Sequence, residues 1–134
     1  AGLRFVYGQR MGSSMRAQRL LERVQREEPA AVREALFEAV SQRYFAAGRA
    51  LSDVEALLEA AEDVGVRTEG LREWLEGREL QEEVERRYAE ILFGWGVGAV
   101  PVTLLSCGGE DYCIQGSQSL AHYTDAIRRL LERP

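Results

Sequence analysis

The sequence is poor in several residues on which whole classes of protein depend. Its 134 residues include two cysteines, Cys107 and Cys113, which are too few for a disulfide framework. The one histidine, His122, has no cluster of cysteines or carboxylates around it in the sequence, so we expect no metal site. The net charge of -5 argues against binding of nucleic acid, because phosphate contacts need an excess of clustered Lys and Arg.

Long apolar runs are also scarce. The first residues lack the apolar segment of a secretory signal, and we expect a cytoplasmic chain. The stretch from Ile91 to Gly109 carries no charge and approaches the length of a membrane span. Its glycines and Pro101 would interrupt a helix there, so we expect no membrane partner.

Most of the chain shows the apolar spacing of amphipathic helices. Alternation over Leu3, Phe5 and Tyr7 predicts a short strand that ends at Gly8. Helical patterns then follow one another with short connections, and Ser52–Glu55 has the pattern of a capping box. Such helices cannot each bury an apolar face alone, so they must pack together as a helical subdomain.

The spacing of apolar residues changes from a helical pattern to a strand pattern after Gly98. Strand-length runs over Val100–Leu105 and Tyr112–Gln115 flank a turn at residues 107–111, which predicts a β-hairpin. A last helix starts near Ser117 or Ser119. The predicted fold is mostly α with a small β part: residues 1–95 form the short strand and the inserted helices, and residues 96–134 form a ββα unit.

Pro101 lies at the start of the first predicted strand. Proline cannot donate to a sheet ladder, so it is confined to strand starts, edges and bulges. Taken alone, a trans proline that opens an ordinary strand is the common arrangement. A cis Val100–Pro101 bond would instead leave the N–H and C=O of Val100 free to pair with an extended ligand.

Four segments, in order, carry a resemblance to a known family. They are "AGLRFVYGQRMGSSMRAQRLL", "YFAAGRALSD", "GVGAVP" and "YCIQGSQSL". In this order they resemble the DsbA-like thioredoxin-fold family, which includes FrnE-type oxidoreductases, 2-hydroxychromene-2-carboxylate isomerases and kappa-class glutathione transferases. The resemblance implies a helical subdomain inserted into a thioredoxin fold, followed by the C-terminal ββα half of that fold. The second segment is closest to the FrnE type.

The resemblance also implies where chemistry takes place. Family members carry their nucleophile, Cys-x-x-Cys or Ser, in a segment that would lie N-terminal to Ala1, so we expect the chain to be a fragment that is inactive alone. In this family Val100 and Pro101 correspond to the substrate-binding pair. Gly116, Ser117 and Gln118 correspond to the position where relatives that use glutathione hold its glutamyl group. We expect the open edge of the hairpin to be filled by a homo-oligomer or by a separate N-terminal piece.

Cys107 and Cys113 flank the predicted turn and form a candidate redox pair if they face each other across the hairpin. Two free thiols are the alternative. The function expected first is a thiol–disulfide oxidoreductase or disulfide isomerase of the FrnE type, acting on peptide thiols and disulfides with no bound cofactor. A glutathione-dependent isomerase or transferase and a non-catalytic helical interaction module are the alternatives.

Overall fold

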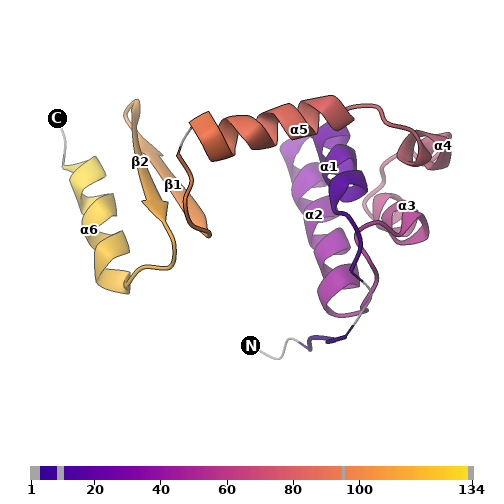
Figure 1. The fold of residues 1–134 in the computed structure, drawn as a ribbon, viewed down its shortest axis with the longest axis horizontal. Coiled ribbons are helices and arrows are strands. Elements are labelled where there is room, and N and C mark those ends of the chain that lie inside the picture. Colours follow the sequence, from indigo (N-terminus) through magenta and orange to yellow (C-terminus); the bar gives the residue numbers. More distant parts are fainter. Residues whose placement is uncertain (1–3, 9–10, 95, 133–134) are drawn as a thin grey trace. The chain divides into compact units, whose positions relative to one another are not determined.

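The computed structural model describes residues 4–8, 11–94 and 96–132, and its contacts divide the chain into two compact units, Ala1–Arg86 and Arg87–Pro134. The helical unit contains α1 (Met15–Glu27), α2 (Ala30–Phe45), α3 (Val54–Asp63), α4 (Leu71–Glu76) and the first part of α5 (Gln81–Ala89). The second unit contains a π-helical turn, η1 (Glu90–Gly94), then β1 (Val102–Cys107), β2 (Glu110–Gln115) and α6 (Leu120–Leu131) (Figure 1). The fold is mostly α with a small β part, as predicted. The predicted boundary between residues 95 and 96 remains a prediction.

Apolar side chains at helical spacing form the core of the helical unit. α1 packs against α2, α2 against α3, and α3 against α4. Leu20, Leu36, Leu57 and Leu75 are almost completely buried in one cluster. Burial of a leucine side chain contributes about 2 kcal/mol, so the helices stabilise one another as the sequence predicted.

A buried guanidinium joins α1 to the end of α4. Arg19 is 2% exposed, and its nitrogens donate to the carbonyl oxygens of Trp74 (2.9 Å), Leu75 (3.3 Å), Gly77 (2.9 Å) and Glu79 (2.6 Å). Burial lowers the pKa of the Arg19 guanidinium, while the charge of Glu79 acts in the opposite direction. The last carbonyls of α4, which a helix leaves without partners, are therefore satisfied by α1.

The predicted strand at the N-terminus is not formed in the described residues 4–8; Leu3 lies outside them. Phe5 instead contacts the Phe45 ring, with centroids 6.0 Å apart, and the Val6 N–H donates to the Phe45 carbonyl at 2.8 Å. This segment therefore lies beside the C-terminal end of α2 and not beside another strand. Alternation of apolar residues was insufficient here, because a strand also needs a neighbouring strand to pair with.

The start of α3 differs by one residue from the predicted capping box. Asp53, not Ser52, is the N-cap, and its carboxylate accepts from the Ala56 N–H at 3.2 Å. Arg49 Nε lies 2.8 Å from the other carboxylate oxygen of Asp53. This hydrogen bond lowers the pKa of Asp53; partial burial raises it, and the bond from Ala56 lowers it further.

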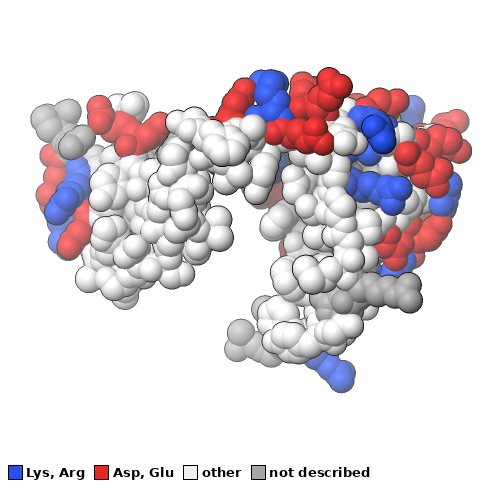
Figure 2. All heavy atoms as spheres, in the orientation of Figure 1, with Lys and Arg blue, Asp and Glu red and all other residues white. Residues whose placement is uncertain are grey.

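The second unit is an antiparallel hairpin with α6 packed against both strands (Figure 1). The strands run through Cys107 and Glu110, so the turn consists of Gly108 and Gly109 alone. Both have positive φ, 60° and 84°, as a two-residue type I′ turn requires. The buried apolar residues among the described part of this unit are Ile114 and Ala126. In the view of Figure 2, charged side chains gather over the helices, and most of the hairpin surface is uncharged.

Candidate functional site

The loop between η1 and β1 presents Val100 to solvent. The Val100 side chain is 81% exposed, and the Val100–Pro101 peptide bond is cis. The Pro101 carbonyl accepts from the Gly116 N–H at 2.8 Å. This bond brings the predicted pair Val100 and Pro101 next to the predicted segment Gly116–Gln118.

The register of the hairpin shows which main-chain groups of β1 point outward. Val102 pairs with Gln115, so Pro101 stands opposite Gly116 at a hydrogen-bonded position. Hydrogen-bonded and non-hydrogen-bonded pairs alternate along antiparallel strands. The N–H and C=O groups of Val102, Leu104 and Ser106 therefore point away from β2, and among the described strands only β2 pairs with β1. Val100 lies beside this open edge.

Gln115 holds the glycine-rich loop that precedes Val100. Its side-chain oxygen accepts from the Gly98 N–H at 2.9 Å, and its Nε2 donates to the Gly96 carbonyl at 3.2 Å. One side chain thus fixes both ends of a three-residue stretch of main chain. Gln115 was not among the site residues predicted from the sequence. The sequence feature that could have pointed to Gln115 is its position: it ends the second predicted strand, opposite the residues that follow the loop.

Ser117 and Gln118 lie in the loop before α6 rather than in its first turn. α6 begins at Leu120, and Ser119 is its N-cap, accepting from the His122 N–H at 3.2 Å. Of the two starts considered from the sequence, Ser119 is the one observed. Gln118 Nε2 donates to the Gln115 carbonyl at 3.1 Å, and Ser117 is exposed.

Cys107 and Cys113 do not face each other across the hairpin. Cys107 pairs with Glu110, and Cys113 pairs with Leu104. Because successive residues of a strand point to opposite faces, this register places the two sulfur atoms on opposite faces of the hairpin. Both cysteines are free and exposed. The condition for a redox pair, that the two cysteines face each other across the hairpin, is therefore not met, and two free thiols are the arrangement observed.

A metal-binding cluster and a membrane-spanning helix each place requirements on the described residues. No group of three His, Cys, Asp or Glu side chains in that part of the chain could hold a metal ion. His122 lies in the first turn of α6, beside the Tyr123 ring. No helix in the described ranges has the length and apolar character needed to cross a bilayer.

The family model of the DSBA-like thioredoxin domain matches residues 2–128. The chain belongs to the DSBA-like thioredoxin domain family. No curated protein matches the chain.

The match covers most of both compact units, so the helical unit and the ββα unit are parts of a DSBA-like domain. Membership places the chain with proteins of the thiol–disulfide oxidoreductase and isomerase type in general. In the described part of the chain, the loop at Val100 adjoins the edge of β1, whose outward main-chain groups are not used in pairing with β2.

Proposed function

We propose that this DSBA-like domain takes part in FrnE-type thiol–disulfide exchange, and that Val100 and the open edge of β1 bind an extended peptide that carries the thiol or disulfide. One observation carries the proposal: the exposed Val100 adjoins a strand edge on which the main-chain groups of Val102 and Leu104 point outward. An extended peptide can add to such an edge through main-chain hydrogen bonds.

The reactive thiolate comes from outside these residues in this proposal. The sequence contains no Cys-x-x-Cys, and its two cysteines lie on opposite faces of the hairpin. In disulfide exchange a thiolate attacks one sulfur of a disulfide, and the other sulfur leaves as a thiolate. The role assigned to this chain is to hold the peptide in place while a dithiol from elsewhere performs that attack.

Peptide binding can be tested with two proline variants of β1. An uncharged extended peptide with an S-methylated cysteine and a fluorescent label is titrated with the chain, and anisotropy is read. Val102→Pro removes an outward N–H close to Val100 without removing a bond to β2, and it should weaken binding about tenfold. Ser106→Pro makes the same change at the far end of the edge and should weaken binding much less. Equal losses in both variants, or no saturable binding by the unaltered chain, would overturn the proposal.

Glutathione is the second candidate ligand, favoured by the bond that joins the Gly116–Gln118 loop to Pro101. A glutathione-dependent isomerase or transferase would hold the tripeptide between this loop and Val100. Glutathione should then bind with an affinity that Ser117→Ala lowers, whereas Ser119→Ala, which removes only the cap of α6, should not. If the peptide binds and glutathione does not compete with it, the oxidoreductase assignment is favoured.

A further inference from the structure

A cavity of about 480 Å³ lies in the helical unit, away from the residues assigned to thiol exchange. It lies between the start of α1, the residue that precedes the α3 cap and the connection from α4 to α5. The residues that matter for its chemistry are Ser13, Arg16, Arg19, Ser52, Glu76 and Arg78. Its lining therefore contains three guanidinium groups and one carboxylate, although the chain as a whole has a net charge of -5.

Two of the three guanidinium groups are held in place by main-chain carbonyls. Arg16 donates to the carbonyls of Ser52 (3.0 Å) and Leu75 (3.3 Å). All four hydrogen bonds of Arg19 also go to carbonyls. Carbonyl dipoles orient a cation without cancelling its charge, so Arg16 contributes a fixed positive charge to the cavity wall. The Arg19 guanidinium adds positive charge from a buried position, where the charge of Glu79 offsets part of it.

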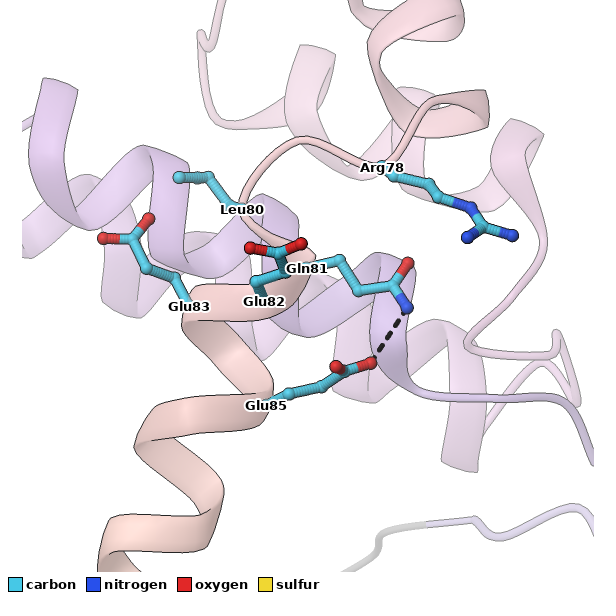
Figure 3. A pocket seen from close by; sticks show the side chains of 6 residues that line it. All are labelled: Arg78, Leu80, Gln81, Glu82, Glu83 and Glu85. Atoms are coloured by element: carbon cyan, nitrogen blue, oxygen red, sulfur yellow. Dashed lines mark hydrogen bonds between the residues drawn. The ribbon is translucent and has the colours of Figure 1, made fainter.

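Arg78 supplies the third charge from an exposed position. Figure 3 shows its side chain extended away from Glu82 and Glu83, which line a neighbouring acidic pocket with it. In that pocket Gln81 donates to Glu85 at 2.9 Å. Within the described ranges, no ion pair engages Arg78, so its guanidinium is available to a ligand.

Two hydroxyl groups complete the lining. Ser13 Oγ accepts from the Met15 N–H at 3.2 Å and keeps its own proton to donate. Ser52 approaches the main chain of Gly12 so closely that a Cβ at position 12 would lie 1.9 Å from Ser52 Oγ. Glycine at position 12 thus allows the two hydroxyls to border one cavity.

We propose that this cavity binds a phosphate group, either as inorganic phosphate or as part of a small phosphate ester. Guanidinium forks and hydroxyl donors are the groups that bind phosphate oxygens in charge-assisted hydrogen bonds. Arg16 forms the preset part of the site, and the buried Arg19 supports it with charge rather than with a guanidinium fork. Arg78 closes on the ligand from the solvent side. Glu76 adds one negative charge to the lining, so the phosphate must bind beside this carboxylate.

The test is a titration of the full chain with inorganic phosphate at constant ionic strength, followed by NMR of the amides that border the cavity. Saturable shifts at Ser13 and Ser52 that chloride does not produce are expected. Arg78→Gln should weaken phosphate binding about tenfold, the loss expected for one charge-assisted hydrogen bond. Arg67→Gln removes the same charge from another exposed position of the helical unit and should leave the affinity unchanged.

Three outcomes would overturn the proposal: no saturable shift with phosphate, equal weakening by Arg78→Gln and Arg67→Gln, or acetate binding as tightly as phosphate. Because Arg78 is exposed, its replacement should leave the fold intact, and the melting temperature without phosphate checks this. Titration with glycerol phosphate distinguishes the two sources. Tighter binding than inorganic phosphate indicates a phosphate ester, and weaker binding indicates the free ion; either result supports a phosphate site.

Discussion

The side-chain oxygen of Gln115 accepts a 2.9 Å hydrogen bond from the N–H of Gly98. Through this contact the last residue of β2 holds the loop that leads to Val100, and its Nε2 holds Gly96 in the same way. The candidate site of this DSBA-like domain therefore depends on the residue that holds the loop before Val100.

Gln115→Ala should loosen the loop while the hairpin persists. The variant loses two partly exposed hydrogen bonds, each worth about 1 kcal/mol. Exchange of the Gly98 amide should rise about tenfold, and exchange of the Thr103 and Leu105 amides inside the ladder should change little. Gln118→Ala, which removes one amide from the adjacent loop, is the control. Unchanged Gly98 exchange in Gln115→Ala would show that the loop is held by other contacts.

Arg19→Met should destabilise the helical unit by about 3 kcal/mol. The replacement keeps the aliphatic stem but removes the donors to the carbonyls of Trp74, Gly77 and Glu79 in a partly buried place, whereas the Leu75 carbonyl keeps its bond from Arg16. Arg23→Met is the matched control, because Arg23 stacks on the same Trp74 ring and is otherwise paired with Glu27 at the surface. Urea unfolding of both variants measures the difference. A similar small loss for both would mean that the Trp74 contact, not the carbonyls, accounts for the role of Arg19.

Acid should remove the contribution of Asp53 to stability. Arg49 lowers the pKa of Asp53 in the folded chain, so the folded state favours the ionised carboxylate. That stabilisation is present above the pKa of the unfolded chain, about 3.9, and is lost as the pH falls through the lower folded value. Asp53→Asn keeps a side chain that can cap α3 but removes the charge. The free energies of unfolding of the two proteins should differ at pH 6 and converge toward pH 2; a constant difference would contradict the role of Arg49.

The two cysteines should behave as independent surface thiols. Both are free and exposed on opposite faces of the hairpin, so a thiol reagent should titrate two groups in the native chain. Mild oxidation should produce no intramolecular disulfide in the monomer by intact mass. In an insulin-reduction assay the chain should be no more active than its Cys107→Ser, Cys113→Ser double variant. Higher activity of the unaltered chain would reassign these cysteines to the chemistry.

Ser119→Ala should cost about 1 kcal/mol of stability, because Ser119 caps α6 through the His122 N–H. Ser117→Ala, two residues earlier in the loop, should cost almost nothing. Thermal unfolding of the two variants measures both effects. Equal losses would show that the start of α6 extends over both serines.

Features that depend on local sequence were predictable. The apolar spacing around Leu20, Leu36 and Leu57 required helices that pack on one another, and they do. Gly108 and Gly109 marked the hairpin, because a type I′ turn needs positive φ at both positions. The loop before Pro101 was recognised from the order of glycine, valine and proline within a longer family pattern.

Features that depend on register and on distant contacts were not predictable. The register places Cys107 opposite Glu110, three residues before Cys113, and because each step along a strand reverses the side chain, the two cysteines lie on opposite faces. The burial of Arg19 depends on carbonyls far along the chain, and helical spacing alone does not reveal it. The contact of Gln115 with Gly98 was not predictable either, because the position of Gln115 at the end of a strand does not show which loop residue it holds.

Amide NMR mapping of the S-methylated cysteine peptide on the chain tests the central claim most directly. The account predicts the largest shifts at Val100, Val102 and Leu104, with little change in α1–α4, and loss of these shifts in Val102→Pro. Shifts centred on the helical unit, or none at β1 at saturating peptide, would contradict the assignment of this edge as the substrate-binding side of the DSBA-like domain.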